Sequence, residues 1–347
     1  MSKYIVIVAL ALSAACGSED GPCDPADQTC EFEHAFAAYT MEAGDERDGL
    51  CMSWTLGNAE TLWVNSVAIE NNGAFHHSNW FFVPDNRWQL PDGHWDCGEH
   101  GFSELAATLF GGVLYAQSTQ VTEETQQFHS GAAVRIPPYS RIIANTHLLN
   151  ARDSALTTEM HVRLSTIPPA QVTAPLAPFR LTYFDLDLPA RSRSEFGGAC
   201  DLTATHERLA GGPLDLELHY ILPHYHALGY RFELSQVGGD GDGDTLYEID
   251  GAYGEPLGHT FAEPIDFGAR GATGIRFACG YDNPGDESVG WGIGDQEMCV
   301  ALGFAETAVA FDGTVDSGAM DHTAPDGTAI HTGSCVVNGT LFDQGTR

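Results

Sequence analysis

Positive charge is scarce in this sequence. Lys3 is its single lysine, and 15 Lys+Arg stand against 48 Asp+Glu, which gives a formal net charge of −33. Such a surface repels phosphate backbones, so nucleic-acid binding is excluded. The chain also lacks an apolar run long enough to span a bilayer and any C-x-x-C pair typical of zinc–thiolate sites. With 43% hydrophobic residues, 39 glycines and 17 prolines, it is expected to be globular and rich in turns.

The N-terminus has the pattern of an export signal. Lys3 precedes the short apolar run 4–12, which ends at the small residues Ser13-Ala14-Ala15-Cys16. The segment 1–16 resembles a bacterial lipoprotein signal, which implies a lipid on Cys16 and a place on the outer membrane or cell surface. Plain secretion or a periplasmic location is the alternative. Residues 17–44 are then expected to form an acidic tether, and the membrane is contacted only through the lipid.

The cysteines agree with export. Nine cysteines without Cys16 leave eight, an even number that predicts disulfides in an oxidising compartment. Cys23 and Cys30 are close enough in sequence to close a local loop. Spacing alone does not pair the others, which are Cys51, Cys97, Cys200, Cys279, Cys299 and Cys335.

Short β-rich runs recur along the body of the chain between clusters of Gly, Pro, Asn and Asp. This pattern predicts an all-β protein built of antiparallel β-sandwiches. Only residues 102–110 have a helical pattern. Four prolines within residues 165–178 indicate a linker, so we expect one sandwich over residues 45–172 and a second over 173–347. The expected strands are 62–69, 75–83, 133–136, 141–149, 159–167, 214–222, 228–237, 275–279 and 299–304.

Histidines are the candidates for chemistry. His76 and His77 are adjacent at the start of an apolar run, so both can face one ion only at a bulge or a strand end. The preceding Asn71-Asn72-Gly73 makes this plausible. His147 lies alone in an apolar strand, where a histidine is more often a core residue than a ligand.

A second group is stronger. His224 and His226 are two residues apart on an expected strand, so their rings should share a face. His219, five residues before His224, should then point to the other face, and no role is assigned to it. Met298 would ordinarily fill a core, but beside two histidines its thioether would be a soft ligand that favours copper.

Together, the motifs resemble the copper type II, ascorbate-dependent monooxygenases, the family of the peptidylglycine alpha-hydroxylating and dopamine beta-monooxygenases. The resemblance covers about residues 45–340, and the conjunction of motifs is more specific than any one of them. In order, the motifs are Cys51-Met52-Ser53-Trp54, His76-His77, His147, His224-Tyr225-His226 and Glu297-Met298-Cys299.

The resemblance implies two copper ions, one in each sandwich, facing each other across a solvent-filled cleft. His76, His77 and His147 would hold the copper that relays electrons. His224, His226 and Met298 would hold the copper that binds dioxygen. The implied activity is hydroxylation of a C–H bond in a small organic substrate, with O2 as oxidant and ascorbate or a similar one-electron reductant as co-substrate.

The same resemblance implies the bridges Cys51–Cys97, Cys279–Cys299 and Cys200–Cys335, which leaves Cys23–Cys30 as a local pair. The chain departs from the peptide-amidating enzyme where that enzyme anchors its substrate: Leu222 replaces an arginine, and Val300 and Leu302 replace polar residues. A more apolar substrate than a peptide carboxylate is therefore expected.

Two other functions remain open. One is a surface lipoprotein of the same fold that binds copper without turnover, suggested by the missing substrate anchors. The other is a zinc hydrolase built on the histidines alone, which leaves Met298 without a role.

Overall fold

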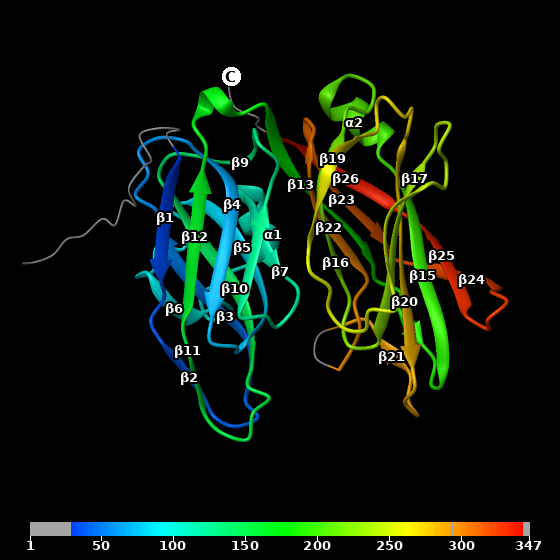
Figure 1. The fold of residues 1–347 in the computed structure, drawn as a ribbon, viewed down its shortest axis with the longest axis horizontal. Coiled ribbons are helices and arrows are strands. Elements are labelled where there is room, and N and C mark those ends of the chain that lie inside the picture. The colour runs from blue at the N-terminus through cyan, green and yellow to red at the C-terminus, as the bar shows by residue number, and fades with distance from the viewer. Residues whose placement is uncertain (1–28, 293–294, 343–347) are drawn as a thin grey trace, which may run out of the picture.

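The computed structural model describes residues 29–292 and 295–342, and in this part of the chain nearly all regular structure is β-strand (Figure 1). The prediction of an all-β protein with two sandwiches is confirmed. Each of the nine expected strands overlaps an observed one, in order β4, β5, β9, β10, β12, β16, β17, β20 and β22, although four of the expected ranges begin before the observed strand, whose bounds are given below.

The first sandwich consists of two sheets. One has the order β6-β3-β10-β5-β7, and the other β1-β12-β4-β9 with β8 also paired to β4, while β2 and β11 form a separate ribbon. The strands are β1 (Cys30–Ala35), β2 (Tyr39–Met41), β3 (Glu46–Thr55), β4 (Leu62–Asn71), β5 (Phe75–Pro84), β6 (Gly93–Asp96), β7 (Gly112–Gln117), β8 (Glu123–Gln127), β9 (Ala132–Ile136), β10 (Ser140–Leu149), β11 (Leu156–Thr158) and β12 (Met160–Thr166).

The second sandwich is built in the same way. One sheet has the order β18-β17-β20-β15-β25-β24, and the other contains β19-β16-β22-β13 with β23 and β26 beyond β13. The strands are β13 (Ala174–Tyr183), β14 (Asp187–Leu188), β15 (Ser192–Asp201), β16 (Glu217–His224), β17 (Gly229–Val237), β18 (Thr245–Asp250), β19 (His259–Asp266), β20 (Gly274–Asn283), β21 (Val289–Gly290), β22 (Val300–Glu306), β23 (Val309–Val315), β24 (Gly318–Thr323), β25 (Ala329–Ser334) and β26 (Val336–Leu341).

In strands of both sandwiches, every second side chain points into the core. In β12, Met160, Val162 and Leu164 are buried while His161 and Arg163 are exposed. This is the period-two pattern of a strand with one face in a core. β23 alternates in the same way in the second sandwich.

The sandwiches are joined by backbone pairing and by apolar contact. β13 pairs in parallel with β9 at its start and antiparallel with β22 along most of its length. The predicted linker is therefore partly wrong: after a 3-10 helix at Pro169–Gln171, the proline-rich segment enters strand β13. Tyr220, Leu222 and Phe304 of the second sandwich also belong to the core cluster of the first.

The tether predicted over residues 17–44 is wrong from Cys30 onward. β1 pairs with β12 along its whole length, and Phe36 and Met41 are buried in the first core. Burial of these apolar side chains stabilises the folded chain, whereas in a solvated tether they would stay exposed to water. Cys16, Cys23 and the export signal lie outside the described residues, so the lipid and the Cys23–Cys30 bridge remain predictions.

Two short helices are present in the described residues. α1 (Glu104–Phe110) matches the expected helical stretch and begins at Ser103, whose hydroxyl accepts a hydrogen bond from the Ala106 N–H. α2 (Thr203–Ala210) was not predicted. No helix within residues 29–292 and 295–342 is both long and apolar enough to cross a membrane.

The structure contains the disulfides Cys51–Cys97, Cys200–Cys335 and Cys279–Cys299. The three pairings implied by the resemblance are confirmed. Bridges of this kind persist in oxidising compartments, which agrees with an exported protein.

The Cys279–Cys299 bridge closes a loop with a sequence separation of 20 residues. A double Cys279→Ala/Cys299→Ala variant is expected to lose about 3 kcal/mol of unfolding free energy, because the unfolded chain regains the freedom that the loop removes. Urea unfolding followed by circular dichroism measures this loss. A transition midpoint equal to that of the unaltered protein would show that the bridge contributes nothing to stability.

Candidate metal centre

His76 and His77 lie at the start of β5, where the strand is irregular. In the pairing with β10, His77 is opposite His147 while Phe75 is opposite Leu148, so His76 is an extra residue on β5. A bulge of this kind lets neighbouring side chains share a side of the sheet. The expected bulge is therefore present, and the two ring centroids are only 4.1 Å apart.

His147 on β10 completes this first group. Its ring centroid is 5.1 Å from that of His76 and 5.6 Å from that of His77. A ligand atom from each of the three side chains lies within 4.8 Å of those from the other two. His147 is thus a member of the cluster rather than an isolated core histidine.

His224 and His226 form the second group, although not on one strand as predicted. β16 ends at His224, and His226 lies in the turn that follows. Their ring centroids are 5.1 Å apart, while Tyr225 between them is fully buried in the second core. The two imidazoles therefore still point to one side, while the Tyr225 side chain points into the second core.

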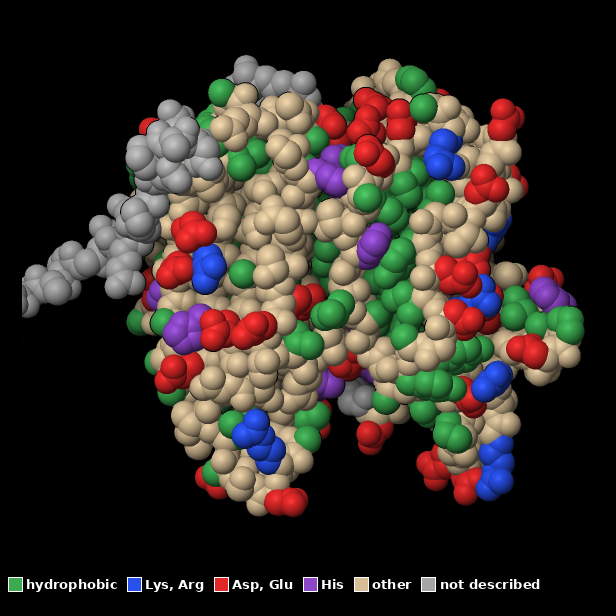
Figure 2. Space-filling view, viewed as in Figure 1, with side chains coloured by type: hydrophobic (Ala, Val, Ile, Leu, Met, Phe, Trp, Pro, Cys, Tyr) green, Lys and Arg blue, Asp and Glu red, His purple; other side chains and the backbone are tan. Residues whose placement is uncertain are grey.

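Among the described residues, no cleft of the expected kind separates the two histidine groups. The His77 ring centroid lies 5.0 Å from that of His224 and 5.5 Å from that of His226, so five imidazoles form one cluster. Contacts between the sandwiches explain this proximity, including a 2.5 Å hydrogen bond from the Ser118 hydroxyl to the Pro256 carbonyl. Histidine side chains are visible along the line where the sandwiches meet (Figure 2).

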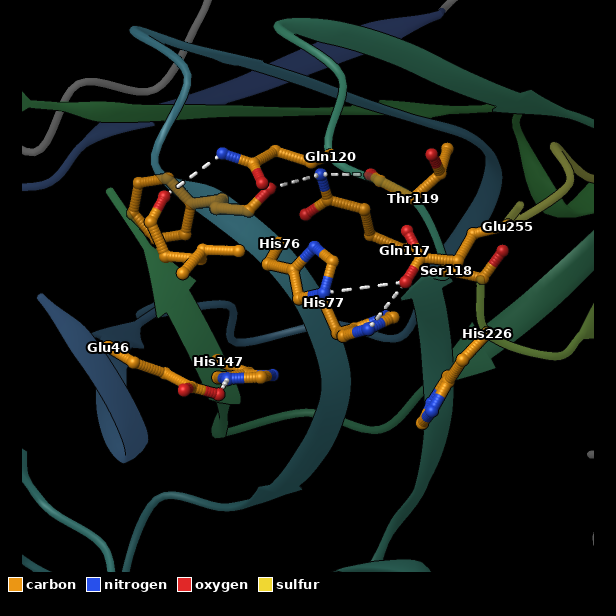
Figure 3. A network of polar contacts seen from close by, with 12 residues as sticks. Glu46, His76, His77, Gln117, Ser118, Thr119, Gln120, His147, His226 and Glu255 are labelled. Atoms are coloured by element: carbon orange, nitrogen blue, oxygen red, sulfur yellow. Dashed lines mark hydrogen bonds and ion pairs between the residues drawn. The ribbon is translucent and has the colours of Figure 1, made fainter. Parts of the chain in front are cut away.

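Two carboxylates that the sequence did not single out hold the first group in place (Figure 3). Glu46 is 2.7 Å from Nε2 of His147. Glu255, from the loop before β19, is 3.4 Å from Nε2 of His76 and 3.0 Å from Nε2 of His77. A carboxylate that accepts from one ring nitrogen leaves the other nitrogen as the electron-pair donor for an ion, as in many metal sites.

The remaining ring nitrogens fit that arrangement. Nδ1 of His76, His77 and His224 is buried without a hydrogen-bond partner among the described residues. In His226, Nδ1 lies 2.7 Å from the Gln296 carbonyl, to which it can donate, so Nε2 is the atom left to bind an ion. Buried nitrogens without partners are costly unless a ligand engages them, so the residues present suit a metal.

Burial keeps four of the imidazoles neutral, those of His76, His77, His224 and His226. Burial lowers the pKa of His76 to about 4, helped by the neighbouring His77, and burial with His147 nearby lowers the pKa of His77 to about 4. The pKa values of His224 and His226 are also lowered, chiefly by burial. Neutral imidazole is the form that binds metals, so the cluster is ready to do so at pH 7.

Glu297 links the second group to the segment that carries Met298. Its carboxylate accepts hydrogen bonds from the N–H groups of His226 at 2.8 Å and Leu228 at 2.7 Å. Burial raises the pKa of Glu297 to about 7. From the sequence, Glu297 was noted only as part of a motif. Its role in holding His226 depends on a contact between residues that are 71 positions apart.

Met298 follows Glu297 and precedes the bridged Cys299, so its backbone is held from both sides. Its carbonyl also accepts a hydrogen bond from the buried Tyr281 hydroxyl. The Met298 side chain is half-buried. The segment next to His226 is thus firmly positioned, as a thioether ligand requires.

No family model and no curated protein matches this chain. Among solved structures, a putative secreted protein of Parabacteroides distasonis is 7% identical, with 82% of this chain and 91% of that chain covered at a TM-score of 0.22. The subviral particle protein VP2 of infectious bursal disease virus is 9% identical, with 82% and 74% covered at a TM-score of 0.23. An archaeal virus protein with a triple jelly-roll fold is 9% identical, with 77% and 58% covered at a TM-score of 0.21. Likenesses this weak carry no argument about function.

Proposed function

We propose that this protein is a copper-dependent monooxygenase that hydroxylates a C–H bond of a small organic substrate with O2 and an ascorbate-type reductant. The observation that supports this most is the cluster of five histidines contributed by two sandwiches, with Met298 next to the residue that holds His226. A nitrogen-rich set with one thioether suits copper better than zinc or calcium.

The chain's residues would divide into two ligand sets. His76, His77 and His147 would hold one copper, oriented by Glu46 and Glu255. His224, His226 and Met298 would hold the other. When bound, copper supplies one-electron transfer and the activation of dioxygen, and ascorbate supplies the two electrons that accompany insertion of one oxygen atom and reduction of the other to water.

The protein itself would position and protect these groups. The Gln296 carbonyl fixes the tautomer of His226, and the Glu297 carboxylate fixes its backbone. The contact between His77 and His224 brings the two ligand sets together without a long path for electrons. Tyr220 and Leu222, which alternate with their neighbours on β16 so as to share a face with His224, pack into the first core.

The residues at the positions where the peptide-amidating enzyme binds its substrate indicate the class of substrate. Leu222, where the peptide-amidating enzyme that the sequence resembles has an arginine, is only 1% exposed and packs in the first core. Such a residue offers neither a charge nor a hydrogen bond to a carboxylate. An apolar or weakly polar small molecule is therefore the proposed substrate.

The test is oxygen consumption by the copper-loaded protein with ascorbate and a panel of small aromatic and aliphatic compounds, with products identified by mass spectrometry after reaction under 18O2. We expect product that carries one 18O atom and requires both copper and ascorbate. Tight copper binding with no labelled product across the panel would favour the alternative, a copper-binding surface protein without turnover. Hydrolysis of esters or amides by the zinc-loaded protein would favour a hydrolase.

A further inference from the structure

A second group of potential ligands lies at the other end of β16, away from the histidine cluster. It consists of Glu217 and His219 on β16 and Glu306 on β22. A ligand atom of each lies within 4.8 Å of those of the other two. The strand separates this group from His224 by five residues or more, which corresponds to about 16 Å or more of extended chain.

The backbone explains why these three side chains meet. Glu217 and Glu306 are directly opposite each other in the antiparallel pairing of β16 with β22. The register then shifts between Leu218 and Tyr220, so His219 is an extra residue in a bulge. The bulge overturns the expectation from strand parity and brings His219 beside the two carboxylates.

One feature of the group is unfavourable without a cation. His219 is only 3% exposed, and neither of its ring nitrogens has a hydrogen-bond partner among the described residues. A buried imidazole without partners costs free energy that a bound ion would recover.

The protonation state suits binding. Burial, with His129 nearby, lowers the pKa of His219 to about 4, so the ring is neutral at pH 7. Glu217 and Glu306 are both half-buried, which leaves a route from solvent to the site. The His129 ring, which the first sandwich contributes, lies 6.2 Å from that of His219, so the group is at the boundary between the sandwiches.

We infer that Glu217, His219 and Glu306 form a binding site for one divalent zinc-type ion, separate from the histidine cluster. One imidazole and two carboxylates are ligands that Zn²⁺ accepts at about 2.0–2.2 Å, and small side-chain rotations would bring them to that distance. The imidazole disfavours Ca²⁺ and Mg²⁺ relative to transition metals. The ion would hold β16 to β22.

The test compares the zinc content of metal-free protein with that of a Glu217→Gln/Glu306→Gln variant after equilibrium dialysis against Zn²⁺. The histidine cluster is intact in both, so zinc bound there cancels in the difference. We expect the variant to bind one fewer zinc ion per chain. Glu263→Gln, at an exposed position of β19, is the matched control and should retain the full zinc content.

Thermal unfolding separates metal binding from a structural effect. Without zinc, the double variant should unfold at about the same temperature as the unaltered protein, because glutamine has nearly the shape and volume of glutamate. Saturating Zn²⁺ should raise the melting temperature of the unaltered protein by about 5 °C more than that of the variant. Equal zinc content in the two proteins would overturn the inference.

A second variant guards against a folding defect in the first. The His219→Ala variant should also bind one fewer zinc ion per chain than the unaltered protein. In zinc X-ray absorption, its spectrum should show a smaller imidazole contribution than that of the unaltered protein. Full zinc content in a folded His219→Ala protein would contradict the site. The outcome is independent of copper binding and of turnover.

Discussion

Replacing Met298 by leucine is expected to lower ascorbate-dependent hydroxylation by about 100-fold, at the upper end of effects seen around metal sites. Leucine has nearly the volume of methionine, so the change removes the sulfur while the local packing is kept. Oxygen uptake and product formation under saturating ascorbate measure the effect. The expected loss is in turnover rather than in folding, because the backbone of this segment stays held by Glu297, Tyr281 and the Cys279–Cys299 bridge.

Met320→Leu is the matched control for this variant. Met320 lies on β24 and is 57% exposed, so its replacement should leave turnover unchanged. If Met298→Leu retains the activity of the unaltered protein, the thioether is not a ligand and the assignment of the oxygen-binding site is wrong.

Replacing Glu297 by alanine is expected to weaken the second copper by about 10- to 100-fold and to cost about 3 kcal/mol of stability. Glu297 is 1% exposed, and the change would leave the N–H groups of His226 and Leu228 without their acceptor inside the protein. His226 would then lose its fixed position. Copper titration monitored by a competing chelator measures the affinity, and urea unfolding measures the stability.

Glu263→Ala, at an exposed position of β19, controls for the loss of one negative charge. The first copper, whose proposed ligands are His76, His77 and His147, should keep its affinity in both variants. Equal weakening of both coppers in Glu297→Ala would indicate a general loss of structure instead of a local role.

Much of the fold could be predicted because its signals are local. Period-two alternation and turn residues identified the central strands, and apolar spacing identified α1. The missed elements have weaker local signals. β15 contains Gly197 and Gly198 and is formed through pairing with β20 and β25. β1 has only half-buried and exposed residues, three of them charged or histidine.

The candidate site shows the same limit. The histidines were found because two pairs and one lone residue stand out in apolar strands. Glu46 and Glu255 were missed because their roles come from contacts between distant segments. The adjacency of His77 and His224 also depends on how the sandwiches pack, which no motif encodes. His219 was misjudged because the strand parity used for it is broken by a bulge.

The most direct test of the central claim is copper stoichiometry of the purified protein combined with X-ray absorption of its Cu(I) form. The account predicts two copper ions per chain and a sulfur scatterer that is absent in the Met298→Leu variant. One copper or none, or a preference for zinc with no sulfur scatterer, would contradict it.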